Sequence, residues 1–224
     1  MNIINGSGVE LNKHSPSLQV PQYQSEKASL HSQIQSLGAS RRLCAYTALG
    51  TLGDPEVPGA TCSEFTALAC GAKRVIQYST FEAAAADVIN GKIEVVLVPA
   101  AYEKLNPFIQ SADLIVIDQF KVPIPSLVLA GRPGTTANGG KLFHHPATSP
   151  LLLEVLGHYE LALAVGSNVE ACRSVLEEEN TICITNAICA ERFGLEIFRV
   201  IRKRPIMPFI VFAAVKADEN LANN

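Results

Sequence analysis

From residue 43 onward, short apolar runs alternate with helical patterns, and this alternation leaves few folds open to the chain. The first series reads strand, helix, strand, helix, strand, over residues 43–49, 63–70, 74–78, 81–89 and 93–99. The last run is almost continuously apolar, as expected for a strand that is buried on both faces. Strands that alternate with helices in this way predict a parallel sheet covered by helices.

A second series of the same kind follows, over residues 141–144, 149–158, 161–165, 167 onward, 181–185 and 187–193. Between the two series, residues 114–119 and 122–130 are strand-like, and Pro123 and Pro125 predict an edge or crossing strand for the second of them. The last strand-like run, 206–215, can return to the first series. The pattern therefore predicts the α/β fold class, with two Rossmann-like lobes and a ligand cleft between them.

These patterns also set the expected domain organisation. Residues 1–40 are polar and predict a flexible or peripheral N-terminal extension, with a short helix around residues 25–37. The first lobe is expected to span residues 41–125 plus 200–216, and the second lobe residues 126–199. Residues 217–224 are expected to form a C-terminal tail.

Composition excludes several classes of function. The net charge of the 224 residues is -3 and the Lys and Arg residues are scattered, which argues against a nucleic-acid partner. The six cysteines form no close CxxC pair, so we expect reduced thiols in a cytoplasmic protein, with no disulfide frame and no zinc site. We find no secretory signal, no membrane-spanning run, no glycine fingerprint for phosphate and no metal-ligand cluster, and we expect no cofactor.

Three predicted helix starts or strand ends carry candidate ligand donors. Thr61 and Glu64 form a capping box, so Thr61, Cys62 and Ser63 would stand at a helix N-terminus, where backbone N–H groups favour a carboxylate. Equivalent donors in the second lobe are Ser167, Asn168, Thr185 and Asn186. Each could equally be a cap alone, but several on one cleft rim predict a small anion with more than one carboxylate.

Three further side chains could take part in chemistry. His145, at a predicted strand end, could bind an anion or move a proton, although a lone His is usually structural. Tyr102 could donate from the cleft wall or could only pack. The helix dipole is expected to lower the pKa of Cys62, but no paired base is evident, which disfavours nucleophilic catalysis.

The order of these motifs resembles the catalytic domain of the prephenate dehydratases over residues 44–214. The family stretches are matched by Ala60-Thr61-Cys62-Ser63-Glu64, Phe81, Val98-Pro99-Ala100-Ala101-Tyr102, His144-His145-Pro146, Ser167-Asn168-Val169-Glu170-Ala171 and Ala190-Glu191-Arg192-Phe193-Gly194-Leu195. The resemblance implies a fold of the periplasmic-binding-protein type II kind, with the ligand cleft between the lobes.

The departures from that family are informative. Its final Asn-x-Thr-Arg-Phe becomes Pro205-Ile206-Met207-Pro208-Phe209, so the Thr held to protonate the leaving hydroxyl and the Arg held to bind a carboxylate are absent. We expect no ACT regulatory domain in the chain. In these respects, and in Val98 to Tyr102, Thr185-Asn186 and Met207, the chain resembles the non-aromatising prephenate decarboxylases of secondary metabolism, of the bacilysin and aeruginosin type.

This resemblance implies a cofactor-independent carbon–carbon lyase that converts prephenate to a dihydro-hydroxyphenylpyruvate. Thr61 and Ser63 would hold one carboxylate, Ser167 and Asn168 the pyruvyl carboxylate, and the proton donor could be His145, Tyr102 or bound water. The alternatives are a dehydratase-like carbon–oxygen lyase or tailoring enzyme that acts on another ring carboxylate in antibiotic biosynthesis, for example of sulfur-containing tropones, and a non-catalytic aromatic-acid-binding module. The chain could also form a homodimer.

Overall fold

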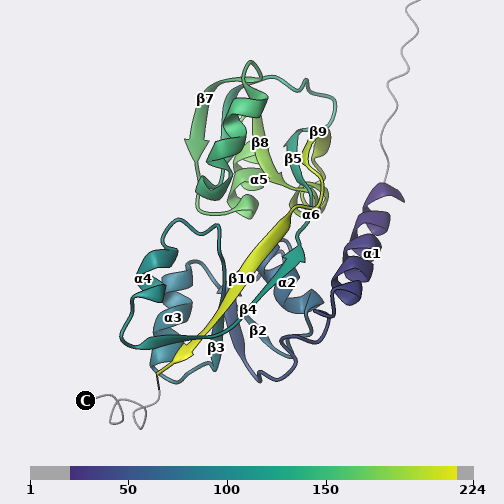
Figure 1. Cartoon of the computed structure of the whole chain (residues 1–224). Coiled ribbons are helices and arrows are strands. Elements are labelled where there is room, and N and C mark those ends of the chain that lie inside the picture. Colours follow the sequence, from purple (N-terminus) through teal and green to yellow (C-terminus); the bar gives the residue numbers. More distant parts are fainter. Residues whose placement is uncertain (1–20, 216–224) are drawn as a thin grey trace, which may run out of the picture.

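The computed structural model describes residues 21–215, with side chains from residue 26 on. Within this range the chain forms two five-stranded sheets, each flanked by helices, and Figure 1 shows them one above the other. Residues 1–20 of the expected extension, and the expected tail at 217–224, lie outside the described residues.

The first sheet has the strand order β2-β1-β3-β10-β4. Its strands are β1 (Leu49–Leu52), β2 (Val75–Tyr78), β3 (Val95–Pro99), β4 (Leu114–Pro123) and β10 (Ile206–Ala214). Strands β1, β2 and β3 are parallel, whereas β10 runs antiparallel between β3 and β4. We call this sheet and its helices, α2 (Cys62–Ala69), α3 (Phe81–Ile89) and α4 (Leu105–Ile109), the first lobe.

The second sheet has the order β7-β6-β8-β5-β9. Its strands are β5 (Leu127–Gly131), β6 (Gly139–His144), β7 (Tyr159–Ala164), β8 (Thr181–Asn186) and β9 (Glu196–Arg202). With the 3-10 helix η1 (Pro146–Val155) and the helices α5 (Asn168–Glu177) and α6 (Ala187–Arg192), it makes the second lobe. Gly194 follows Phe193, the C-cap residue of α6, at φ 63°, a left-handed conformation that glycine adopts without strain.

Two segments connect the lobes, residues 124–126 after β4 and residues 203–205 after β9. They lie against each other, because the N–H of Ile124 donates to the carbonyl of Pro205 at 3.0 Å and the N–H of Arg204 donates to Ser126 Oγ at 3.2 Å. The prediction that residues 122–130 form one edge or crossing strand is wrong in part. The prolines lie at the crossing itself, and β5 beyond it is an inner strand between β8 and β9.

Three other local expectations are corrected. The first strand begins at Leu49, since Leu43 is buried in a turn whose N–H donates to the carbonyl of Cys70. Ser79 and Glu82 have the spacing of a capping box, but the N-cap of α3 is Thr80, whose hydroxyl accepts from the N–H of Ala83, so that box does not form. The helix expected over 149–158 is a 3-10 helix that starts at Pro146, and Pro150 within it cannot donate an α-helical hydrogen bond.

The N-terminal helix α1 (Pro21–Ser36) packs on the first lobe more closely than a flexible or peripheral extension would. Leu30 and Ile34 are fully buried in the core of that lobe, which residues 1–40 were not expected to join. Glu26 accepts from the N–H of Ser126 at 2.8 Å, and Ser29 bonds Arg204. Helix α1 therefore contacts both segments that connect the lobes (Figure 1).

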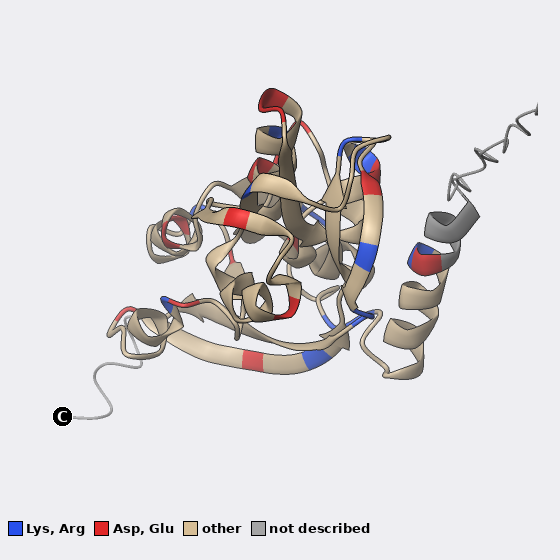
Figure 2. Cartoon of the chain, turned by 90° about the horizontal axis from the view of Figure 1, so that it is seen from above, with Lys and Arg blue, Asp and Glu red and all other residues tan. Residues whose placement is uncertain are grey.

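Charged residues of both signs are spread over the chain, and Figure 2 shows no broad cluster of Lys and Arg on the side that faces the viewer. In the described part of the chain, no helix combines the length and apolarity that crossing a membrane requires. The same residues hold no group of three His, Cys, Asp or Glu side chains arranged to bind a metal ion.

Candidate active site

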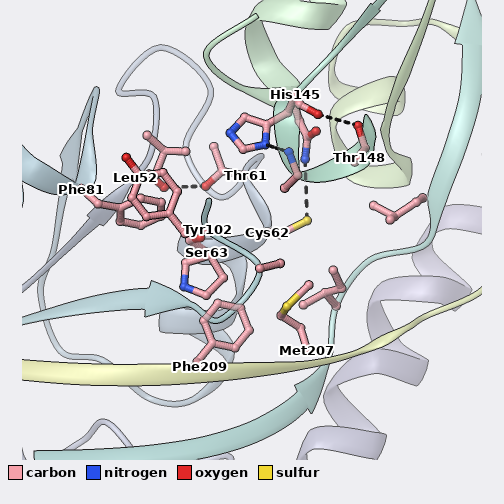
Figure 3. Close-up of a pocket in the computed structure, with 16 residues that line it drawn as sticks. Leu52, Thr61, Cys62, Ser63, Phe81, Tyr102, His145, Thr148, Met207 and Phe209 are labelled. Atoms are coloured by element: carbon pink, nitrogen blue, oxygen red, sulfur yellow. Dashed lines mark hydrogen bonds between the residues drawn. The ribbon is translucent and has the colours of Figure 1, made fainter. Parts of the chain in front are cut away.

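A cavity lies between the two lobes, beside the segments that connect them (Figure 3). Its polar lining comes from the start of α2, the end of β3, the residues around η1 and the start of α5, and consists of Thr61, Cys62, Ser63, Tyr102, His145, Thr148 and Asn168. Its apolar wall consists of Leu52, Phe81, Pro99, Ala101, Ile124, Leu127, Ala147, Met207 and Phe209. Since no Lys or Arg in the described part of the chain lines the cavity, an anion there would be held by neutral groups of these residues.

The N-terminus of α2 supplies the most concentrated set of donors. Thr61 is its N-cap, and the hydroxyl accepts from the N–H of Glu64 at 3.1 Å while donating to the carbonyl of Leu52 at 2.7 Å. Among the described residues, nothing accepts from the N–H of Cys62, the N–H of Ser63 or the hydroxyl of Ser63, whose side chain is only 4% exposed. Such orphan donors at a helix N-terminus fit a carboxylate.

Glu64 completes only half of the predicted capping box. Its Oε1 accepts from Gln77 Nε2 at 2.8 Å, and its Oε2 has no partner among the described residues, so the carboxylate does not reach back to Thr61. Burial raises the pKa of Glu64. The capping box is incomplete because the side chain of Glu64 points into the first lobe, where it accepts from the amide of Gln77 on β2.

His145 projects into the cavity from the N-cap position of η1. Its Nδ1 accepts from the N–H of Ala147 at 3.1 Å, which assigns the hydrogen of the neutral imidazole to Nε2. Burial lowers the pKa of His145, against the opposing charge of Glu103. At neutral pH the ring is therefore neutral and can donate one hydrogen bond from Nε2.

The ring of Tyr102 lines the cavity, but its hydroxyl is already hydrogen-bonded within the protein. The ring packs edge-on against Phe81 and Phe108, and the hydroxyl donates to Glu82 Oε1 at 2.6 Å. Burial and the Glu82 carboxylate raise the pKa of Tyr102. As a proton donor to a ligand, Tyr102 would first have to give up that bond.

Cys62 and Asn168 meet across the cleft, one from each lobe. Asn168 Nδ2 donates to Cys62 Sγ at 3.8 Å, and the Oδ1 of Asn168 is buried with no partner among the described residues. Burial raises the pKa of Cys62 to about 12, so the expectation that the helix dipole would lower this pKa is wrong. The desolvation of the thiolate outweighs the dipole, and the thiol is protonated at neutral pH.

Further contacts join the lobes next to the cavity. Arg173 of α5 makes ion pairs at 2.7 Å with both Asp54 and Glu56, which lie in the loop between β1 and α2. The same loop places Ala60 in the core of the second lobe, where its carbonyl accepts from Asn186 Nδ2 at 2.8 Å. The start of α2 is therefore held by both lobes.

Three of the ten expected site residues do not line the cavity, and their polar atoms have partners in the protein. Ser167 caps α5 by accepting from the N–H of Glu170. Thr185 and Asn186 are fully buried; Thr185 donates to the carbonyl of Asn168, and Asn186 caps α6 and binds Ala60. These residues support the start of α5 and the loop before α2.

The cavity also contains residues that the sequence analysis did not single out. Thr148 follows the His145-Pro146 pair and donates to the carbonyl of His145 at 2.8 Å. Ile124, Leu127 and Phe209 lie on or beside the connecting segments. Proximity to Pro146 was a usable signal for Thr148, whereas the apolar residues carry no pattern that separates a cavity wall from ordinary core.

Comparisons with known proteins find similar sequences and similar folds. No protein-family model matches the chain. The chain is 24% identical over 207 residues to a prephenate decarboxylase of Bacillus subtilis, a match that covers 85% of this chain and 98% of that protein. A prephenate decarboxylase of Bacillus amyloliquefaciens matches with the same identity and coverage. The chain is a relative of the prephenate decarboxylases.

The solved structures concern the fold. A prephenate dehydratase of Arthrobacter aurescens in complex with L-Phe has a TM-score of 0.58 at 18% identity, covering 76% of this chain and 61% of that one. The prephenate dehydratase of Staphylococcus aureus gives 0.50 at 15%, covering 74% and 66%. The quorum quenching acylase GqqA gives 0.54 at 20%, covering 76% and 65%.

This relative of the prephenate decarboxylases thus spans less than two thirds of each of those three chains. The expected resemblance and the expected fold class, two α/β lobes around a cleft, are confirmed. Because the acylase shares the fold, the fold alone does not determine the reaction, and the cavity must be considered in its own right.

Proposed function

We propose that the protein is a cofactor-independent lyase that decarboxylates prephenate and leaves the ring non-aromatic, giving a dihydro-hydroxyphenylpyruvate. The relatives that match most of the chain carry the name prephenate decarboxylase. The dehydratases share the fold, so the choice between losing the ring hydroxyl and keeping it depends on the acids in the cavity.

The observation that carries the proposal is that, among the described residues, every proton-bearing side chain that lines the cavity is a weak acid. A hydroxyl group leaves readily only when an acid of pKa near the working pH protonates it. His145 is neutral, Tyr102 is bound to Glu82, and the thiol of Cys62 has a pKa of about 12. Met207 lines the cavity and has no proton to give. Expulsion of the hydroxyl is therefore unassisted.

Decarboxylation differs from dehydration in the strength of the acid that it requires. The bond between the ring and its carboxylate breaks, CO2 leaves, and the electron pair spreads over three ring carbons. This carbanion is strongly basic and takes a proton even from a weak acid, while the hydroxyl stays on the ring. A cavity without a strong acid therefore suits decarboxylation and disfavours dehydration.

The neutral lining has a place for each part of the substrate. The N–H groups of Cys62 and Ser63 and the Ser63 hydroxyl would hold one carboxylate, and the amide of Asn168 the other, with its buried Oδ1 free to accept from the ring hydroxyl. The wall of Leu52, Phe81 and Phe209 would desolvate the ring carboxylate, which favours its conversion to neutral CO2.

We also propose the setting in which this activity is used. The enzyme would belong to secondary metabolism, in the biosynthesis of an antibiotic, and would act in the cytoplasm, where its free cysteines remain reduced. It would act on a small cyclic carboxylate and bind neither nucleic acid nor membrane, in keeping with the spread of charged residues of both signs over the chain (Figure 2). Pairing into a homodimer is part of this proposal.

The test is to incubate the purified protein with prephenate at neutral pH and to follow CO2 release and the products by NMR. We expect CO2 together with a product that has no aromatic ring, at a rate well above that of a reaction without protein. Formation of phenylpyruvate above that background would indicate a dehydratase. Binding of prephenate without turnover would indicate an aromatic-acid-binding module, and no binding would favour another ring carboxylate.

A further inference from the structure

The proposed reaction needs a proton donor for the ring, and the hydrogen bonds of the cavity narrow the choice. This inference rests on the proposed decarboxylation. Three lining groups already donate their hydroxyl hydrogens within the protein: Thr61 to the carbonyl of Leu52, Thr148 to the carbonyl of His145, and Tyr102 to the carboxylate of Glu82. Each would have to break a short hydrogen bond to protonate a ligand.

Among the described lining residues, the Cys62 thiol, the Ser63 hydroxyl and the Nε2–H of His145 donate no such hydrogen bond. Among the described residues none accepts a hydrogen bond from the Cys62 thiol or the Ser63 hydroxyl. A thiol is a far stronger acid than an alcohol or the N–H of a neutral imidazole. Of these protons, the one on Cys62 Sγ is the easiest to transfer to carbon.

Two features of the surroundings of Cys62 would partly offset the desolvation of the thiolate left behind. Cys62 is the first residue of α2, so its sulfur lies at the positive end of the helix dipole. Asn168 Nδ2 already donates to that sulfur at 3.8 Å from the opposite lobe. Ser63, beside it, is 96% buried and its hydroxyl has no partner among the described residues, which places a ligand group next to Cys62.

We propose that Cys62 is the catalytic proton donor, which protonates the ring carbon after CO2 has left. The S–H bond breaks, its hydrogen forms a bond with one of the two equivalent ring carbons beside the hydroxyl-bearing carbon, and the electron pair of the carbanion enters that C–H bond. The electron pair of the S–H bond stays on sulfur as a thiolate, which water reprotonates before the next turnover. No oxidant, reductant or metal enters the balance.

The position of the donor sets the stereochemistry of the product. The two ring carbons beside the hydroxyl-bearing carbon are equivalent in the free substrate, and protonation of one of them makes the hydroxyl-bearing carbon stereogenic, because its two ring neighbours then differ. A thiol fixed at the start of α2 reaches one of the two, from one face. Loss of the thiol should therefore change the isomer ratio, a result that a purely structural role would not produce.

The experiment compares wild type, Cys62→Ala, Cys62→Ser and Cys44→Ala with prephenate in D2O. Cys44 is a partly buried cysteine outside the cavity, so its variant is the matched control. Wild type and Cys44→Ala should give one product isomer, with deuterium on one face. Cys62→Ala should lose at least tenfold in rate or give both isomers, and Cys62→Ser, which keeps the size of the side chain, should behave in the same direction.

Two results would have different meanings. If wild type releases no CO2, the proposed function fails, whatever the role of Cys62. If wild type decarboxylates and both Cys62 variants, folded by circular dichroism, keep its rate within twofold and its single isomer, Cys62 is not the donor. In that case Ser63 or water supplies the proton.

Discussion

At the scale of single residues, Thr61 uses its hydroxyl both as donor and as acceptor within the protein. Thr61→Val removes the bond to the Leu52 carbonyl and the cap on the N–H of Glu64. We expect a loss of about 1–2 kcal/mol in the free energy of unfolding, measured by urea titration. Thr61→Ser keeps both bonds and is the control; equal stability of the Val and Ser variants would show that the cap contributes nothing.

The neutral state of His145 predicts a dependence of stability on pH. Its pKa is lower in the folded protein than in the unfolded chain, so the unfolded chain binds the proton first as the pH falls. Stability should therefore decrease on acidification from about pH 6.5, the ordinary value, through the folded pKa. His145→Gln cannot titrate, so its unfolding free energy should fall less than that of wild type between pH 7 and 5. Parallel curves would contradict this.

The sequence could identify residues whose type and position both signal chemistry. Thr61, Cys62 and Ser63 start a helix after a strand, and His145 stands before a proline, so their place at the cavity was predictable. Whether a cap also faces the cavity was not predictable, because Asn186 caps a helix after a strand as Thr61 does but does not line the cavity. The difference arises from tertiary packing.

At the scale of elements, the ion pairs of α5 with the loop before α2 hold the lobes together. Arg173→Ala removes the contacts to Asp54 and Glu56, so the lobes should separate more often and the radius of gyration from small-angle scattering should rise. Because these groups are partly exposed, the free energy of unfolding should fall by less than about 1 kcal/mol. Arg202→Ala, which breaks a pair with Glu154 inside the second lobe, is the control and should leave the radius unchanged.

The same ion pair should respond to acid. Burial acts to raise the pKa of Asp54, but the bond from Arg173 and the N–H of Glu56 hold it below its ordinary value. The stability that the Asp54 carboxylate contributes is therefore present above about pH 4 and lost as the pH falls through the lowered pKa.

For the Arg173→Ala variant at neutral pH, an unchanged radius of gyration would mean that the contacts through Ala60 alone hold the lobes together.

Helix α1 should be essential to the first lobe. Leu30→Ala leaves a cavity in a fully buried site and should cost about 2–5 kcal/mol. Leu37→Ala, at a position that is 53% exposed, is the control and should cost far less. Equal midpoints of denaturation in the two variants would return α1 to the peripheral role that its polar sequence suggests. The sequence did not predict this contact, because Leu30 and Ile34 are the only buried apolar residues among the α1 side chains that the structure describes.

At the scale of the whole molecule, alternation of strands and helices was enough to predict two α/β lobes and the return of the last strand. This alternation predicts where the strands lie along the chain, but it does not predict which strands are neighbours in a sheet. Residues 122–130 were predicted as one edge or crossing strand because of Pro123 and Pro125, and only the pairing of β5 with β8 and β9 shows that β5 is an inner strand. Strand order depends on contacts between distant residues, which local patterns do not contain.

The place of β10 in the first sheet has a consequence for how the chain acquires its structure. β10 lies between β3 and β4, so the first sheet is incomplete until residues 206–214 arrive, whereas the second sheet uses only residues 127–202. On the ribosome, the lobe in the middle of the chain can form first, while β4 waits with Ile115, Val116 and Ile117 without a partner strand. In refolding followed by pulsed hydrogen exchange, amides of β5 to β9 should become protected before those of β3 and β4. The first sheet, although most of its strands precede the second lobe in the sequence, would then be completed after it.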